Sequence, residues 1–237
     1  MAKKTAKHQT AVRTKAHASP VKAHHYEEIL GDVAEALVPK RMPHLSTRAF
    51  AIILIVTGVI GLVASFVLTA DKIHVLRDPN YNPLCNINPI FSCGSVMKSS
   101  QAQVWGIPNT VFGLVGFSMV LAVAATLLAG ARMKAWFWRC WMLGMVAGLG
   151  GFLYLFIQSV FNLKTLCVYC MSTWAALLPL IWYSLIWSLQ NGYLPIPKRA
   201  ESLARFIRKE HLSLLLLAYL TIIAIIVTKF WYFFKTL

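Results

Sequence analysis

Three long stretches of this chain contain no Asp, Glu, Lys or Arg: residues 49–70, 140–163 and 211–228. A helix rises about 1.5 Å per residue, so each stretch is long enough, or nearly so, to cross the roughly 30 Å hydrocarbon core of a membrane. Hydrophobic residues make up 58% of the sequence, charged residues make up 13%, and the mean hydropathy is +0.62. Such a chain has too few polar side chains to cover a water-soluble domain of its size. The predicted fold class is therefore an all-α integral membrane protein.

Two further uncharged stretches, residues 99–131 and 165–197, are longer still, and each is expected to contain one helix. Five membrane-spanning helices are therefore expected. We place the spans near residues 49–70, 107–130, 137–159, 168–189 and 211–233. The first apolar run is too long for the core of a secretory signal and follows a polar tail, so we expect it to remain as an anchor. The predicted organisation is a basic tail, residues 1–48, followed by a membrane domain, residues 49–237, whose first loop covers residues 71–106.

The basic tail divides into two parts. Residues 1–25 are rich in Lys, His, Ala and Thr and show no apolar periodicity, which predicts disorder. Over residues 26–38, apolar side chains recur at helical spacing with acidic side chains between them, which predicts a short amphipathic helix. Because its polar face is acidic, we expect this helix to pack at the inner surface of the membrane and not to bind lipid tightly.

Lysine and arginine are distributed unevenly over the segments that connect the spans. Seventeen of the 23 lie in the tail, the second loop and the fourth loop, and six lie on the other side. By the positive-inside rule, the N-terminus is cytoplasmic and the C-terminus is outside. We therefore predict a multi-pass protein of the cytoplasmic or inner cell membrane. Because the positive charge lies beside apolar runs, we expect membrane lipids as its partners and no nucleic acid.

Four of the five cysteines fall on the predicted outer side. Cys85 and Cys93 lie in the first loop, and Cys167 and Cys170 form the motif CVYC at the start of the fourth span. Cys140 stands apart at the cytoplasmic start of the third span, where we expect it to act as a small apolar residue.

The spacing of the CVYC motif places both sulfur atoms on one helix face, one turn apart, where they are close enough to bond to each other. Unpaired backbone N–H groups at a helix N-terminus stabilise a thiolate, so we expect the pKa of Cys167 to be lowered. The motif therefore predicts a reactive pair.

Three interpretations of the four outer cysteines are open at this point. They are a zinc site, a pair of structural disulfides, or a redox relay between two dithiols. Zinc is disfavoured because the gap between Cys85 and Cys93 is unlike the usual ligand spacing, so we expect no metal. A short loop anchored by spans at both ends needs little extra stabilisation. We favour the relay, in which electrons leave the membrane dithiol for a quinone, an acceptor that dissolves in hydrocarbon.

Short segments around the two cysteine pairs add to this pattern. They are Ser99-Ser100, Trp105-Gly106 and Asn109-Thr110-Val111-Phe112-Gly113. With these segments the chain resembles the vitamin K epoxide reductase family, including its bacterial members, over roughly residues 49–190. The resemblance implies a four-helix bundle around a quinone, with a fifth transmembrane helix. Many bacterial members continue into a thioredoxin-like domain where this sequence stops, so we expect the partner to be a separate polypeptide.

The resemblance also implies a role for each cysteine. Cys85 would meet the substrate protein and would form a disulfide with Cys93. Cys93 would exchange with Cys167, and Cys170 would face the quinone and reduce it. Ser99 or Ser100 lies where the family has a serine near the active cysteines, although a helix cap is an equally good reading of either.

The implied quinone site involves three further residues. Asn109 matches a family asparagine that donates a hydrogen bond to a quinone carbonyl. Phe112 follows it on the second span and is a candidate to line the site, with helix packing as the alternative role of such an aromatic residue. Trp174 stands where vitamin K-reducing members have a tyrosine, a departure that is compatible with a different quinone.

The predicted function is that of a membrane thiol:quinone oxidoreductase. It would reoxidise a separate extracytoplasmic thioredoxin-like thiol oxidase that forms disulfides during oxidative protein folding, and it would use a quinone of the menaquinone or ubiquinone type. Two alternatives remain open. One is a reductase of quinones or quinone epoxides that uses small thiol donors. The other is a non-enzymatic membrane protein with structural disulfides or a zinc site.

Overall fold

The computed structural model describes residues 45–78, 80–83, 85–88, 90–104, 106–195 and 201–231 of the 237-residue chain. These residues belong to one compact unit, Pro43–Leu237. The predicted disorder of residues 1–25 and the predicted helix at residues 26–38 lie outside the described residues. In chain order the elements are α2 (Thr47–Arg77), α3 (Cys93–Lys98), the 3₁₀ helix η1 (Ser100–Ala102), β1 (Gln103–Val104), β2 (Ile107–Pro108), α4 (Asn109–Leu128), α5 (Ala135–Ile157), the π-helix η2 (Gln158–Leu163), α6 (Val168–Gln190), α7 (Glu201–Lys209) and α8 (His211–Lys229).

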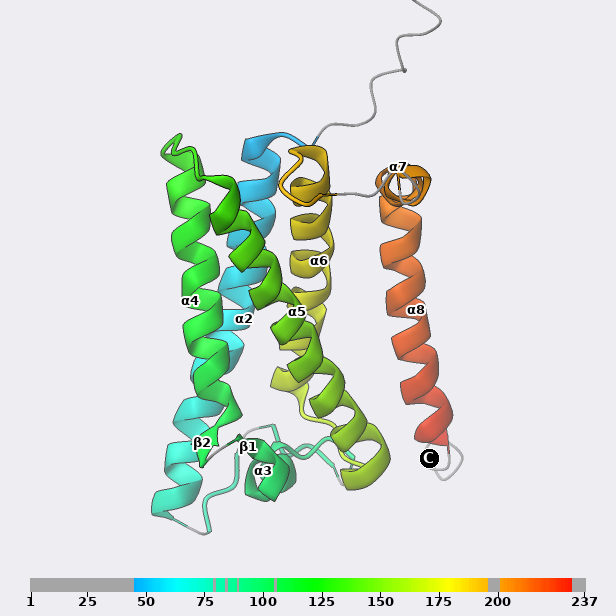
Figure 1. The fold of residues 1–237 in the computed structure, drawn as a ribbon. Helices are drawn as coiled ribbons and strands as arrows, with labels where there is room; N and C mark the ends of the chain where they lie inside the picture. The colour runs from blue at the N-terminus through cyan, green and yellow to red at the C-terminus, as the bar shows by residue number, and fades with distance from the viewer. Residues whose placement is uncertain are drawn as a thin grey trace, which may run out of the picture. The chain divides into compact units, whose positions relative to one another are not determined.

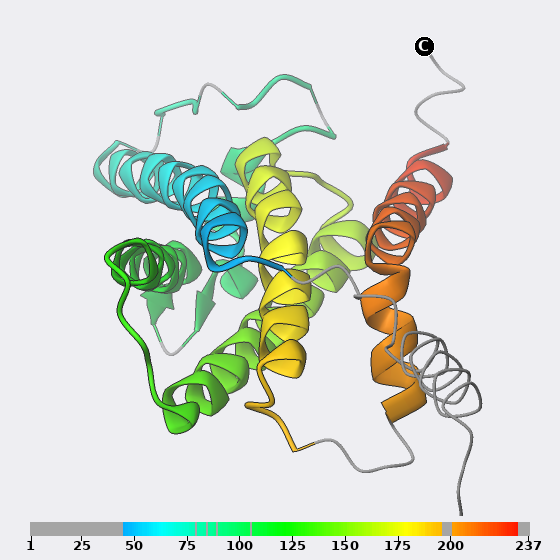
Figure 2. The ribbon, with the colours of Figure 1, turned by 90° about the horizontal axis from the view of Figure 1, so that it is seen from above.

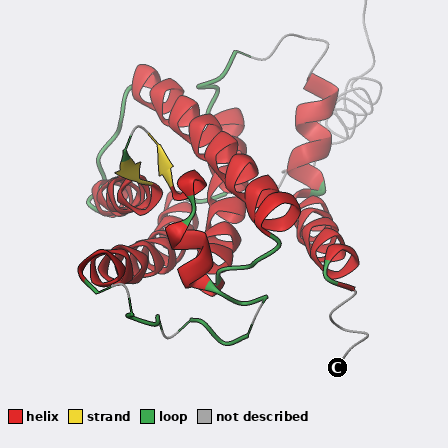
Figure 3. Ribbon diagram, turned by 90° about the horizontal axis from the view of Figure 1, so that it is seen from below, coloured by secondary structure: helices red, strands yellow, loops and turns green. Residues whose placement is uncertain are grey.

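Five helices in the described part of the chain are long and apolar enough to cross a membrane. They are α2, α4, α5 with η2, α6 and α8. The only strands in the described part, β1 and β2, form one short antiparallel pair (Figure 3). The predicted all-α membrane fold is confirmed.

Helix α2 continues past residue 70, where we placed the end of the first span, to Arg77. Two charged residues, Asp71 and Lys72, lie in this extension, and both are buried. The Tyr81 hydroxyl donates a hydrogen bond to Asp71 over 2.9 Å, and Lys72 Nζ donates one to the Met97 carbonyl. Since both charged groups have partners, the helix does not have to end where the first charge appears.

Helix α2 is the centre of the four-helix part, where it packs along both α4 and α6 (Figure 1). Gly61 on α2 allows the close approach to α4, because a Cβ at this position would overlap the ring of Phe117. At the end where α2 begins, Phe50 stacks on Trp187 with 4.8 Å between ring centroids. Helix α5 packs against α6 and runs away from α4 after their short connection (Figure 1).

Helix α8 stands beside this four-helix part, as Figures 1 and 2 both show. It contacts α6 through two hydrogen bonds, from the Tyr219 hydroxyl to the Ala175 carbonyl and from Trp182 Nε1 to the His211 carbonyl. Its apolar side chains are otherwise largely exposed, as expected for a helix surrounded by lipid. Helix α8 therefore adds a fifth span at the edge of the core, against which Ile222, Ile225 and Ile226 pack.

Candidate functional site

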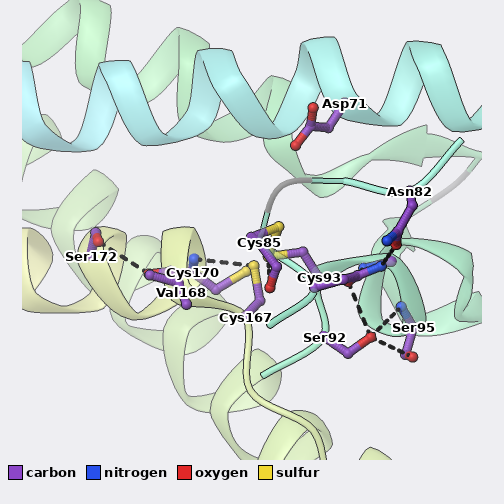
Figure 4. The surroundings of a disulfide bond; sticks show 12 residues. Asp71, Asn82, Cys85, Ser92, Cys93, Ser95, Cys167, Val168, Cys170 and Ser172 are labelled. Carbon is purple, nitrogen blue, oxygen red and sulfur yellow. Dashed lines mark hydrogen bonds between the residues drawn. A yellow bond between two sulfur atoms is a disulfide. The ribbon is translucent and has the colours of Figure 1, made fainter. Parts of the chain in front are cut away.

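The two cysteines of the first loop are joined. Cys85 and Cys93 form a disulfide, with 5.7 Å between their Cα atoms. Both residues are buried, Cys85 at 5% exposure and Cys93 at 0%. This is the bond that the family resemblance implied. It packs against Leu68 and Val75 in the last turns of α2 and against Cys167 at the start of α6 (Figure 4).

A network of side-chain hydrogen bonds holds the loop around this disulfide. The Asn86 side-chain oxygen accepts hydrogen bonds from the Gly94 backbone N–H, over 2.9 Å, and from the Ser92 hydroxyl, over 3.2 Å. Ser92 in turn caps α3, because its hydroxyl oxygen accepts from the Ser95 N–H. A Cβ on Gly94 would lie 2.9 Å from the Asn86 side-chain nitrogen, so the loop requires glycine there. Asn86 thus ties together the backbone next to each cysteine.

Sequence reasoning missed Asn86. The sequence did contain one indication of its role. The spacing from Ser92 to Ser95 is typical of a capped helix start, and the first backbone N–H groups of a helix need acceptors from outside the helix. The sequence does not show that the acceptor comes from the residue after Cys85.

Backbone hydrogen bonds join this loop to the segment in front of α6. Phe91 and Leu166 form a parallel bridge, in which the Leu166 N–H donates to the Ile90 carbonyl over 2.7 Å and the Ser92 N–H donates to the Leu166 carbonyl over 3.0 Å. Cys93 and Cys167 follow directly after these paired segments. Cys85, Cys93 and Cys167 therefore pack in one buried cluster (Figure 4).

Cys167 and Cys170 are free thiols at the start of α6. Cys167 is buried at 1% exposure and is the N-cap of the helix, since its sulfur accepts the Cys170 backbone N–H over 3.4 Å. The pKa of Cys167 is lowered, chiefly by a hydrogen bond from the Cys170 thiol and further by backbone N–H groups, while burial opposes the shift. The direction agrees with the prediction from the helix N-terminus, although the main cause is the neighbouring thiol.

Asp71 and Lys72 from α2 and Tyr81 from the loop lie near the two cysteine pairs. Asp71 is close enough to Cys167 to oppose its ionisation to a small degree. The hydrogen bond that Tyr81 donates to Asp71 raises the pKa of the Tyr81 phenol. Lys72 holds the C-terminal turn of α3 by its bond to the Met97 carbonyl. Sequence analysis did not single out these residues, because their partners are distant in the chain.

A cavity of about 640 Å³ opens between α4, α5 and α6. All three predicted quinone-site residues line it: Asn109, Phe112 and Trp174. Glycines on α5 also form its wall, and a Cβ added at Gly144 or Gly151 would meet nothing within 4 Å. The volume lies within the range of roughly 300–1,000 Å³ that is usual for small-molecule sites.

Asn109 brings an unsatisfied polar atom to this cavity. Its Nδ2 donates to the Gln101 carbonyl over 2.8 Å, whereas its Oδ1 is buried and has no hydrogen-bond partner in the described part of the chain. A buried amide oxygen of this kind is costly unless a bound molecule satisfies it. A carboxamide has two N–H donors, so Asn109 keeps one donor and one acceptor for a ligand.

Trp174 and Cys170 connect the cavity to the cysteines. Trp174 is held edge-on against Phe152 and Phe156, with ring centroids 5.8 Å and 5.4 Å apart. Cys170 is half-buried and packs both against the cluster that contains Trp174 and against the cluster that contains the disulfide. The inner thiol pair therefore lies between the loop disulfide and the cavity wall.

The remaining candidates have other surroundings. The Ser99 hydroxyl donates to the Val96 carbonyl at the end of α3, and the Ser100 hydroxyl donates to Gln101 Oε1. Cys140 is exposed on α5, near the end of the bundle opposite to the other four cysteines. Among the described residues, no three or more His, Cys, Asp or Glu side chains form a group that could hold a metal ion.

A family model described as the vitamin K epoxide reductase family matches residues 52–185, which is more than half of the chain. The matched range contains both cysteine pairs and the three cavity residues named above.

Proposed function

Because the chain belongs to the vitamin K epoxide reductase family, we propose that it is a membrane thiol:quinone oxidoreductase. It takes electrons from a reduced, separate thioredoxin-like protein and passes them to a quinone of the menaquinone or ubiquinone type. One observation carries the proposal: the Cys167–Cys170 thiol pair packs between the Cys85–Cys93 disulfide and the apolar cavity. The end of the bundle that holds the cysteines is assigned to the outer side of the cytoplasmic membrane, because most of the Lys and Arg residues lie on the other side.

The first exchange takes place at the loop disulfide. A thiolate of the partner attacks Cys85, a bond forms between the partner and Cys85, and the Cys85–Cys93 bond breaks with Cys93 leaving as a thiolate. A second thiol of the partner then displaces Cys85 and releases the oxidised partner. Cys85 is the better point of attack, because it is 5% exposed and Cys93 is fully buried.

The second exchange passes the electron pair inward. The Cys93 thiolate attacks Cys167 in an inner disulfide, so that a Cys93–Cys167 bond forms and Cys170 leaves as a thiolate. Cys85 then attacks Cys93, which restores the loop disulfide and releases Cys167. The Phe91–Leu166 bridge supports this transfer, since it brings the attacking and attacked residues together. In the structure the loop pair is joined and the inner cysteines are free thiols.

The cavity fits a quinone ring in size, in apolar lining and in its polar atoms. A bound quinone would accept two electrons and two protons as the Cys167–Cys170 disulfide forms. Asn109 can donate a hydrogen bond from its second N–H to a ring carbonyl, and its buried Oδ1 can accept a hydrogen bond from a hydroxyl of the reduced product. Trp174 forms the cavity wall next to Cys170, and its packing against Phe152 and Phe156 fixes the position of its ring.

The experiment measures quinone reduction by the purified protein with a reduced thioredoxin-like protein as the electron donor. We expect replacement of any one of Cys85, Cys93, Cys167 and Cys170 by Ala to stop turnover with that donor. Cys140→Ala is the matched control and should behave like the native protein. If Cys170→Ala reduces quinone at the native rate, Cys170 is not the terminal donor.

The same assay separates the alternatives. A reductase of quinone epoxides would consume a quinone epoxide in preference to the quinone when both are offered with a small dithiol. Structural disulfides would not change oxidation state when respiratory quinone is withdrawn from membranes, whereas relay cysteines would accumulate as free thiols.

A further inference from the structure

A second pocket lies away from the redox site, between η2 and the end of α8. We call it the lysine pocket, and it has a volume of about 500 Å³. Its lining residues are Val160, Phe161, Lys164, Lys229 and Phe230. It therefore combines two cationic side chains with three apolar ones.

The fold places both lysines at this pocket by specific local geometry. Lys164 ends the π-helix in the left-handed backbone region, with φ of 51°, and it is the one non-glycine residue in the described part of the chain with positive φ. Lys229 lies in the last turn of α8, and its Nζ is 4.7 Å from the centre of the Phe161 ring. This cation–π contact directs the Lys229 ammonium towards η2, across the gap between the two helices.

The charge of the pocket is not neutralised within the described residues. Neither lysine forms an ion pair there, and the contact of Lys229 with the Phe161 ring leaves its charge in place. Four acidic residues are described. Asp71 accepts a hydrogen bond from the Tyr81 hydroxyl, and Asp78 follows the end of α2. Glu201 is the first residue of α7, and Glu210 is the N-cap of α8. Two positive charges therefore face a partly apolar cavity with no anion from the described chain.

The position of the pocket at the ends of two membrane-spanning helices suggests which anion fits it. Both α5 with η2 and α8 are helices able to span a membrane, and the pocket lies where they end. The ends of membrane-spanning helices are expected at the level of lipid headgroups. Lysine at such a level extends its ammonium group towards the headgroups while its carbon chain stays among apolar groups. A phosphodiester with an acyl chain attached matches both parts of the lining.

We propose that the lysine pocket binds the phosphate of an anionic phospholipid, with Lys164 and Lys229 on the phosphate and Val160, Phe161 and Phe230 against the first carbons of the lipid. The site is separate from the quinone cavity, since the two share no lining residue.

Binding at this pocket acts on the attachment of α8. Phe230 follows α8 directly and is buried at 2% exposure in the cluster that contains Ile90, Leu166 and Trp174. Ile90 and Leu166 are the residues whose backbones join the loop to the segment in front of Cys167. A lipid that bridges η2 and α8 therefore holds Phe230 in the cluster that supports the redox site.

The test measures lipid binding to the full-length protein in a non-ionic detergent. Native mass spectrometry with increasing phosphatidylglycerol gives the Kd, and tryptophan fluorescence during heating gives the gain in Tm. We expect phosphatidylglycerol to bind and to raise Tm, and phosphatidylcholine at equal concentration to do neither. The double variant K164Q/K229Q should bind phosphatidylglycerol at least tenfold more weakly.

A matched control removes two positive charges elsewhere. Arg132→Gln with Lys134→Gln changes two exposed residues of the α4–α5 connection and should leave the Kd unchanged. If K164Q/K229Q does not fold, K164R/K229R, which keeps both charges, should retain binding. Equal binding of the two lipids, native affinity in K164Q/K229Q, or the same rise in Tm with inorganic phosphate alone would each overturn the proposal.

Discussion

Replacing Asn86 by Ala should make the Cys85–Cys93 disulfide easier to reduce. The Asn86 side-chain oxygen accepts two hydrogen bonds, from Gly94 N–H and from the Ser92 hydroxyl, and these bonds span the same two chain segments as the disulfide. The hydrogen bonds and the disulfide close the same loop, so formation of the hydrogen bonds favours the disulfide and the disulfide favours the hydrogen bonds. Loss of the hydrogen bonds therefore destabilises the oxidised loop more than the open, reduced loop.

The size of the effect follows from the two bonds. Each contributes about 0.5–1.5 kcal/mol net, so together they favour the closed loop by about 1–3 kcal/mol. For a two-electron couple about 30 mV corresponds to about 1.4 kcal/mol, so the reduction potential should rise by about 20–60 mV.

The potential is measured by equilibrating the protein in glutathione buffers and counting free thiols by alkylation. Cys140, Cys167 and Cys170 are first replaced by Ala, so that only the loop pair is counted. Asn162→Ala is the matched control, because that amide bonds to Gln158 on η2, outside the loop. An unchanged or more negative potential in Asn86→Ala would show that the network does not favour the disulfide.

Two further predictions concern the inner pair and the cavity. The rate at which iodoacetamide alkylates Cys167 should reach half its maximum below the pH of an ordinary thiol, because the pKa of Cys167 is lowered. In Cys170→Ala this midpoint should move to higher pH, since the thiol that stabilises the Cys167 thiolate is lost; an unmoved midpoint would contradict the assigned cause. Gly151→Leu should fill the cavity and raise the KM for quinone at least tenfold while leaving disulfide exchange with the protein partner intact. Gly150→Leu, an exposed neighbour that does not line the cavity, should leave the KM unchanged, and equal effects of the two substitutions would refute the placement of the quinone.

The spans could be predicted from the sequence because each one is a local property. An uncharged apolar run that is long enough to cross hydrocarbon has to be helical, since no water is present to satisfy its backbone groups. Helix α2 extends beyond the predicted end of the first span for the opposite reason. Asp71 and Lys72 look like the start of a loop, but their partners Tyr81 and Met97 lie further along the chain and become neighbours only after folding.

The candidate site divides in the same way. The motif CVYC predicted a reactive pair, and the family resemblance implied the disulfide of Cys85 with Cys93. The positions of Asn109, Phe112 and Trp174 on a cavity wall depend on how α4, α5 and α6 pack, which no local pattern shows. Asn86 was missed because its role depends on a loop that folds back on itself.

The residue pattern alone predicted that this chain lies in a membrane, roughly where it crosses, and which four sulfur atoms gather on one side, because hydropathy and charge act residue by residue. Only the tertiary structure decided that Cys93 lies beside Cys167, that Cys170 touches both the disulfide cluster and the cavity cluster, and that two lysines from distant segments share a pocket. These are contacts between residues far apart in the chain. They arise from the packing of whole helices and from one backbone bridge.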